Sequence, residues 1–81
     1  MTPKQALDRL RWDPRYNFSD AEIWYWDRLS PTGERGIRGS DIVKIESGFL
    51  VLKNARIPLY KVFKIVYHGE VIFERKGKQT S

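Results

Sequence analysis

The chain has 81 residues, no cysteine and a formal net charge of +5. That length suffices for one domain with a modest hydrophobic core, and the absence of cysteine excludes a disulfide framework, a thiolate metal site and a cysteine nucleophile. No apolar run approaches the ~18 residues of a membrane span and no apolar signal sequence follows the N-terminus, so we expect a cytoplasmic protein.

A helix is the first element predicted in the chain, and it begins after Thr2 and ends near Trp12. Thr2 and Gln5 have the spacing of a capping box, with Pro3 at the first helical position. The helix ends at Asp13–Pro14, because proline disfavours a helical residue before it. The spacing of the apolar residues predicts one stripe that packs on the core, formed by Ala6, Leu7 and Leu10.

A strand is predicted over Ala21–Leu29, after a loop at 15–20, because its aromatic side chains suit a pleated sheet better than a helix. One face of this strand carries Ile23, Tyr25, Asp27 and Leu29. The other face carries Glu22, Trp24, Trp26 and Arg28. The favoured interpretation is that the tryptophans pack under the helix as core. The alternative is that they are exposed, in which case Asp27 is buried and needs a partner.

Turns and short strands make up the rest of the predicted fold. A turn at 30–33 leads into a strand at 35–38, and Ser40 is expected to cap a single helical turn over 40–43. The pattern then predicts strands at 49–52, 57–67 and 70–75 and turns at 47–48 and 68–69.

The predicted fold class is α+β, with an N-terminal helix packed on a mostly antiparallel sheet of about four to five strands. Residues 1–75 would form this single domain, followed by a basic, flexible tail at 76–81. Positive charge is concentrated at the C-terminal end, since residues 61–81 hold five basic and two acidic side chains. A basic surface of this kind favours nucleic acid or another polyanion as the partner.

Residues that could carry catalysis are scarce. His68 is the sole histidine and falls in a predicted turn, where an exposed structural residue is the simpler interpretation. The sequence has no phosphate-binding glycine loop and no serine-triad motif. Glu70 is the one acidic residue at metal-ligand spacing from His68, which is too few for a metal site. We therefore predict no catalytic residue, no metal and no other cofactor, and we favour a binding module over an enzyme.

Four short motifs, taken in order, resemble a known protein family. They are Arg-Trp-Asp-Pro at 11–14, Tyr-x-Asp-Arg at 25–28, Ile-Pro-Leu at 57–59 and Gly-Glu-Val-Ile-Phe-Glu-Arg at 69–75. From about Ala6 to Arg75 the chain is similar to the RNA cyclic group end recognition domain family. Its members are mostly archaeal and uncharacterised, and eukaryotic relatives carry the domain beside RNA-processing domains. The resemblance implies a module that binds RNA termini such as 2′,3′-cyclic phosphates.

One position departs from the family pattern, which usually has histidine after Ile-Pro-x and then a basic residue. Here the two positions are Tyr60 and Lys61. Tyrosine can donate a hydrogen bond or stack, but it is not a general base near neutral pH, so the departure argues against a catalytic site. The departure affects phosphate binding less, because Lys61 keeps the positive charge.

The leading hypothesis is that the chain binds RNA termini or single-stranded RNA without catalysis. The predicted RNA-binding residues are Arg11, Trp26, Arg28, Tyr60, Lys61 and Arg75. The basic residues would hold phosphate, and the aromatic residues would stack on a base or donate a hydrogen bond. Asp27 would support the site by orienting Arg28.

Two other functions remain open. A protein-interaction module would use an exposed sheet edge beside Pro58 to pair with a strand of a protein partner. A small RNA-end phosphodiesterase or cyclase is the less favoured alternative, because a general base is missing. No membrane partner is expected.

Overall fold

The computed structural model describes residues 2–75, which contain one α-helix, seven strands and three single turns of 3-10 helix. Helix α1 spans Pro3–Trp12. The strands are β1 (Ala21–Trp26), β2 (Glu34–Arg38), β3 (Ile42–Glu46), β4 (Phe49–Leu52), β5 (Arg56–Pro58), β6 (Val62–Tyr67) and β7 (Glu70–Glu74). The 3-10 turns are η1 (Phe18–Asp20), η2 (Gly39–Asp41) and η3 (Leu59–Lys61). None of the helices within residues 2–75 has the length and apolar character to cross a membrane. The predicted basic tail at 76–81 lies outside the described residues.

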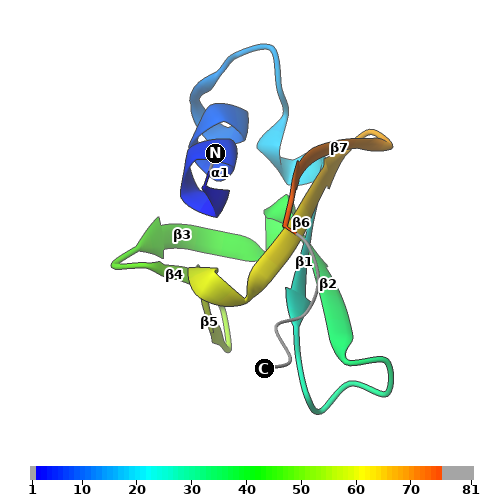
Figure 1. The fold of residues 1–81 in the computed structure, drawn as a ribbon. Coiled ribbons are helices and arrows are strands. Elements are labelled where there is room, and N and C mark those ends of the chain that lie inside the picture. The colour runs from blue at the N-terminus through cyan, green and yellow to red at the C-terminus, as the bar shows by residue number, and fades with distance from the viewer. Residues whose placement is uncertain (1, 76–81) are drawn as a thin grey trace.

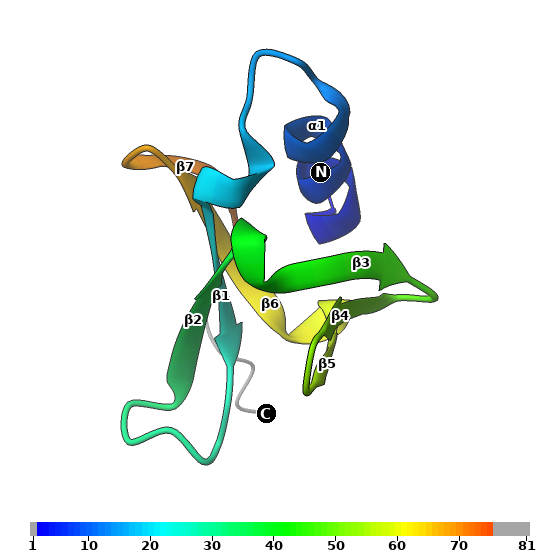
Figure 2. The same cartoon turned by 180° about the vertical axis from the view of Figure 1, so that it is seen from behind.

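The seven strands divide between two antiparallel sheets. The larger sheet has the strand order β2-β1-β6-β7, and the smaller sheet has the order β3-β4-β5. Figure 1 shows α1 and the smaller sheet together on one side of the larger sheet, and Figure 2 shows β2 continuing through η2 into β3. The predicted α+β class and antiparallel pairing are confirmed, but the strands form two sheets rather than one. The turns η2 and η3 redirect the chain between the sheets, and the period of two along each strand does not reveal such turns.

Helix α1 forms for the local reasons that the sequence indicates. The Thr2 hydroxyl accepts a hydrogen bond from the Gln5 N–H (3.1 Å), and the Gln5 side-chain oxygen accepts one from the Thr2 N–H (2.9 Å). These reciprocal bonds satisfy amide groups that have no partner inside the helix. The predicted apolar stripe is fully buried, so the helix and its core face are both confirmed.

The hydrophobic core lies between α1 and the face of β1 that carries Ala21 and Ile23. Both side chains are fully buried, as are Leu50 of β4 and Ile65 of β6. Ile65 is paired with Ile23 across the ladder, and all four pack in one cluster with the α1 stripe. The core therefore joins the helix and both sheets.

The two tryptophans of β1 lie on the opposite face of the strand and are only half-buried, so the favoured interpretation of a tryptophan core is wrong. Small and aliphatic side chains on the Ala21 face let the sheet approach the helix closely. Trp24 instead occupies the space above Gly36, its partner across the β1–β2 ladder. The absence of a side chain at Gly36 makes room for the indole.

Strand β1 ends at Trp26, three residues earlier than predicted. The Asp27 N–H donates to the Gly33 carbonyl (2.9 Å), which closes a loop between β1 and β2. Arg28 and Leu29 are therefore loop residues, and Leu29 is 90% exposed. Asp27 is the first residue of this loop, directly after β1, and is not part of the core.

The predicted helical turn over 40–43 is shorter and begins earlier than expected. It is η2, and Ile42 already belongs to β3. Ser40 is not the capping residue, because the Asp41 carboxylate accepts a hydrogen bond from the Arg38 N–H (3.0 Å). The predicted turns at 47–48 and 68–69 are confirmed, with positive φ at both residues of each turn.

Candidate nucleic-acid interface

Most of the predicted site residues lie at one end of the larger sheet, where β1 ends and β6 begins. Trp26 is the last residue of β1, and Tyr25 is paired with Val62 at the start of β6. Turn η3, which immediately precedes Val62, contains Tyr60 and Lys61. We define the hairpin-end cluster as the polar side chains at this end: Asp27, Arg28, Arg35, Tyr60 and Lys61.

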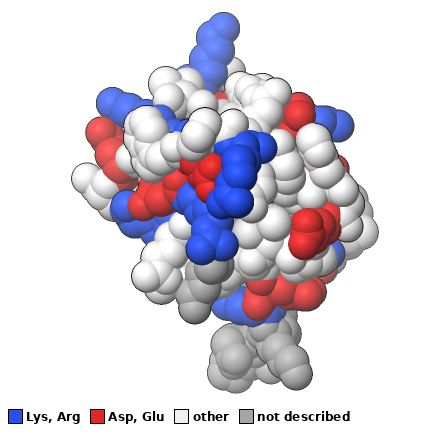
Figure 3. Space-filling view, turned by 90° about the horizontal axis from the view of Figure 1, so that it is seen from above, with Lys and Arg blue, Asp and Glu red and all other residues white. Residues whose placement is uncertain are grey.

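Arg11 is not brought together with the other predicted residues. Its guanidinium carbon lies 5.1 Å from the Trp12 ring centroid and 5.8 Å from that of Phe18. Phe18 begins η1, which leads into the opposite end of β1. Figure 3 views the molecule from the side that carries the loop between α1 and η1, and acidic and basic side chains are interleaved there. Among the described residues, the basic side chains on that side are separated by acidic ones.

The carboxylate of Asp27 organises the hairpin-end cluster. Its Oδ1 accepts a hydrogen bond from the Leu29 N–H (2.9 Å), and its Oδ2 accepts one from Arg35 Nε (2.7 Å). The Leu29 amide, the Arg35 guanidinium and the positive charge of Lys61 lower the pKa of Asp27 below its usual value. Lys61 lies close enough to Asp27 for the two charges to interact.

Arg35, not Arg28, is the arginine that Asp27 orients, so the predicted Asp27–Arg28 pair is wrong. The β1–β2 register places Arg35 opposite Tyr25, within reach of the carboxylate at the end of β1. Arg28 is exposed and has no hydrogen bond or salt bridge within residues 2–75. Its guanidinium is therefore available to a ligand.

Acid titration should reveal the role of Asp27 in the fold. Because its pKa is lowered, the carboxylate stabilises the folded state above the usual pKa of about 3.9, and this contribution is lost as the pH falls through the lowered value. We expect Asp27→Asn to lower the free energy of unfolding at neutral pH, and the difference from the parent to shrink below about pH 4. Urea unfolding at a series of pH values measures this difference. Glu34→Gln, an exposed carboxylate on the same hairpin, is the control. A difference that stayed constant from neutral to acid pH would contradict the assignment.

Tyr60 and Lys61 are both exposed on η3, and Tyr60 as a residue is 71% exposed. Neither side chain has a hydrogen bond or salt bridge within residues 2–75. An exposed phenol and an exposed ammonium group on adjacent residues offer a ring, a hydroxyl donor and a positive charge. The hydroxyl and the ammonium group can both donate hydrogen bonds to a phosphate oxygen.

An aromatic pair borders the cluster. The rings of Trp26 and Phe63 are stacked, with centroids 5.3 Å apart and planes inclined by 14°. The register of β6 shifts between the Trp24–Lys64 and Tyr25–Val62 pairs, so that Phe63 is the extra residue of a β-bulge. The bulge directs the Phe63 side chain toward Trp26, and the stacked Phe63 ring supports the indole.

Arg75 supports this bulge. Its Nη2 donates to the Val62 carbonyl (2.7 Å), and its backbone N–H donates to the Phe63 carbonyl (2.8 Å). Its Nε is buried and has no hydrogen-bond partner within residues 2–75. The guanidinium predicted to hold phosphate is thus partly engaged in the fold.

His68 lies far along β6 from the hairpin-end cluster, at the turn into β7. It is exposed as predicted, and its Nε2 lies 3.0 Å from Asp20 Oδ2. The cluster therefore has no histidine to act as a general base. Residues 2–75 contain no group of three or more histidine or acidic side chains placed to hold a metal ion.

Arg35 and Phe63 are the two members of this region that the sequence analysis missed. Pairing outward from the predicted turn at 30–33 places Arg35 near the end of β1, so hairpin register was a usable signal for it. No comparable signal existed for Phe63, because its position depends on the bulge.

The chain has recognisable relatives. The model of the MJ1316 RNA cyclic group end recognition domain family matches residues 1–75. A UPF0248 protein of Methanopyrus kandleri is 43% identical over 63 residues, which cover 78% of this chain and 85% of the relative. A UPF0248 protein of Archaeoglobus fulgidus is 37% identical over 70 residues, covering 85% of this chain and 99% of the relative. A UPF0248 protein of Saccharolobus solfataricus is 34% identical over 67 residues, which cover 80% of this chain and 83% of the relative. No solved structure is similar enough to count as a match.

Proposed function

Because the chain belongs to the MJ1316 RNA cyclic group end recognition domain family, we propose that it is a non-catalytic module that binds RNA termini, 2′,3′-cyclic phosphate ends in particular. The observation that supports this proposal is the arrangement of the hairpin-end cluster. Arg28 and Lys61, two cations without a salt bridge in the described part of the chain, lie at the same end of the sheet as the exposed Tyr60 and the Trp26–Phe63 stack.

Each group of the cluster suits one part of an RNA end. Arg28 and Lys61 would hold the oxygens of the terminal phosphate through charge-assisted hydrogen bonds. The Tyr60 hydroxyl would donate to a phosphate oxygen, where the family pattern usually has histidine. Trp26 would stack the terminal base, which contributes ~1–3 kcal/mol per base in single-strand binding. Charge supplies affinity in this scheme, and Tyr60 supplies recognition of the end.

Binding without turnover is consistent with the groups present in the cluster. Opening a cyclic phosphate requires a base to activate water and an acid to protonate the leaving oxygen. Tyrosine is not a base near neutral pH, and the carboxylate of Asp27 already accepts hydrogen bonds from Leu29 and Arg35. The cluster is better suited to hold an RNA end than to hydrolyse it.

Direct binding to three matched RNAs tests the proposal. They share one sequence and end in 2′,3′-cyclic phosphate, 3′-phosphate or 3′-hydroxyl, and each is titrated at two salt concentrations. We expect tighter binding of the cyclic end, and weaker binding of all three at higher salt because phosphate contacts release counterions. Tyr60→Phe should reduce the preference for the cyclic end by about tenfold, the effect of losing a hydrogen bond to a charged group.

The control for this experiment is Tyr16→Phe. Tyr16 packs edge-on against Tyr67, and its hydroxyl has no hydrogen bond within residues 2–75. Equal, salt-sensitive binding to the three RNAs would reduce the proposal to a general RNA surface. No binding to any of them would reject it and favour a protein partner at a sheet edge. Detectable turnover of the cyclic end would contradict the non-catalytic assignment.

A further inference from the structure

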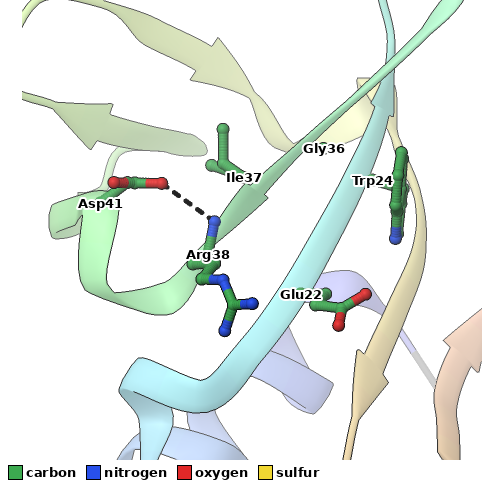
Figure 4. A pocket seen from close by; sticks show the side chains of 6 residues that line it. All are labelled: Glu22, Trp24, Gly36, Ile37, Arg38 and Asp41. Carbon is green, nitrogen blue, oxygen red and sulfur yellow. Dashed lines mark hydrogen bonds between the residues drawn. The ribbon is translucent and has the colours of Figure 1, made fainter. Parts of the chain in front are cut away.

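The larger sheet also carries a shallow open hollow of about 440 Å³, where β1 and β2 meet η2. Figure 4 shows Glu22 and Trp24 along β1, Arg38 on the neighbouring strand and the Asp41 carboxylate turned toward the Arg38 backbone. The hollow combines an aromatic ring with charges of both signs. This combination suits a small, flat, polar ligand.

The indole of Trp24 forms one wall of the hollow. A Cβ atom placed on Gly36 would lie 2.9, 3.0 and 3.0 Å from three carbons of the six-membered ring. Nearly equal distances to three ring carbons mean that Gly36 faces the plane of the indole rather than its edge. The ring thus rests on the backbone of β2, which holds it in a fixed orientation before any ligand arrives.

Two charged side chains of the hollow, Glu22 and Arg38, are opposite each other in the β1–β2 ladder. Neither of them has a hydrogen bond or salt bridge within residues 2–75. Asp41 differs, because its carboxylate is bound to the Arg38 N–H. The Glu22 carboxylate can accept hydrogen bonds from two donors, and the Arg38 guanidinium can donate to phosphate or carbonyl oxygen.

We propose that this hollow binds a nucleobase, with guanine preferred, from the RNA strand whose terminus the hairpin-end cluster holds; the inference therefore rests on the proposed function. The base would stack on Trp24. Guanine presents the N1–H and N2–H donors side by side, and these match the two acceptor oxygens of Glu22. Adenine, cytosine and uracil lack this pair of adjacent donors. Arg38 would hold the neighbouring phosphate.

The spacing along β1 connects the hollow to the hairpin-end cluster. Trp24 and Trp26 lie on the same face of β1, two residues and therefore about 7 Å apart. This separation is comparable to one step between nucleotides in an extended single strand. A strand that follows β1 would place its terminal base at Trp26 and the preceding base at Trp24.

Nucleoside 5′-monophosphates test the hollow independently of end recognition, because they have no cyclic end. The four monophosphates are titrated into the full chain, and the NMR signal of the Trp24 indole N–H, assigned with Trp24→Phe, reports occupancy. We expect guanosine monophosphate to shift this signal and to bind about tenfold more tightly than the other three.

Three variants locate the interaction. Glu22→Gln should remove the guanine preference, because one acceptor oxygen is replaced by a donor. Glu70→Gln, an exposed carboxylate on β7, is the matched control and should leave the preference unchanged. Gly36→Ala should weaken binding of all four nucleotides, because its methyl group displaces the Trp24 ring.

The outcomes separate the two proposals. The proposal that the hollow binds a nucleobase is overturned if no nucleotide shifts the Trp24 signal, or if Glu22→Gln leaves the guanine preference intact. Either result would overturn it even if the protein discriminates among the three RNA ends. Guanine binding that depends on Glu22, without discrimination among the RNA ends, supports the base site and rejects end recognition.

Discussion

Replacing Gly39 by alanine is expected to lower the free energy of unfolding by about 3 kcal/mol, the upper part of the range for inserting atoms into a packed interior. Gly39 is buried, and a Cβ atom there would overlap the Phe18 carbonyl oxygen and lie 2.8 Å from the carbonyl carbon. Both are backbone atoms, so no rotamer change relieves the contact. The η1 turn must move, and η1 leads directly into β1.

Chemical denaturation of Gly39→Ala and of the parent measures this effect. Gly48→Ala is the control, because no atom of residues 2–75 lies within 4 Å of its added Cβ atom and the strain comes from its φ of +79°. A left-handed residue of this kind costs about 1–2 kcal/mol. The contact between η1 and η2 would be shown to be loose if Gly39→Ala were no less stable than Gly48→Ala.

The double variant Arg28→Ala/Lys61→Ala is expected to weaken binding to a short RNA by about 100-fold. Each cation would lose a charge-assisted phosphate contact, at about 1.4 kcal/mol or tenfold per contact. The slope of log affinity against log salt should also fall by about 1.4, since each phosphate contact on a single strand contributes ~0.7. Both side chains are exposed, so we expect the stability of the fold to change little.

A charge-matched variant distinguishes contacts from general electrostatics. Arg9→Ala/Arg15→Ala removes the same charge from beside Asp13, where α1 ends and the loop toward η1 begins. The salt bridge that Arg15 makes with Asp13 is exposed and contributes little to stability. Fluorescence anisotropy with one labelled RNA compares both variants with the parent. Equal losses of affinity would show that the cluster acts only through net charge.

Structural features that depend only on residues close together in the sequence could be predicted from it. The capping box of Thr2 and Gln5 and the apolar stripe of α1 are local, and both were predicted correctly. The turn at His68–Gly69 is also local, because glycine tolerates the positive φ that a two-residue hairpin requires. These features need no knowledge of which strand pairs with which.

Features that depend on strand pairing were not predicted. The period of two in β1 shows two faces, but not which of them α1 covers. That choice depends on Gly36 lying opposite Trp24, which is a matter of strand register. Strand β3 was missed for a similar reason, since its residues extend only because β4 pairs with them. The division into two sheets follows from turns that have no distinctive pattern.

The residues of the candidate site also differ in how far the sequence predicted them. Trp26, Arg28, Tyr60 and Lys61 were predicted from charge, aromatic character and family resemblance, and the structure places them at one end of the larger sheet. Arg35 was missed because it reaches Asp27 across the hairpin. Arg75 was predicted as a phosphate ligand, but its contact with the Val62 carbonyl gives it a supporting position in the fold.

The attachment of Arg75 to the bulge has a consequence for how such a module can be combined with an enzyme. Its hydrogen bonds to the Val62 and Phe63 carbonyls bring the end of the described chain beside the residues proposed to hold an RNA terminus. A nuclease or ligase fused after this point by a short linker would meet the captured terminus at a high effective concentration. Tethering of this kind would let the proposed RNA-end site decide which RNA ends a fused enzyme encounters.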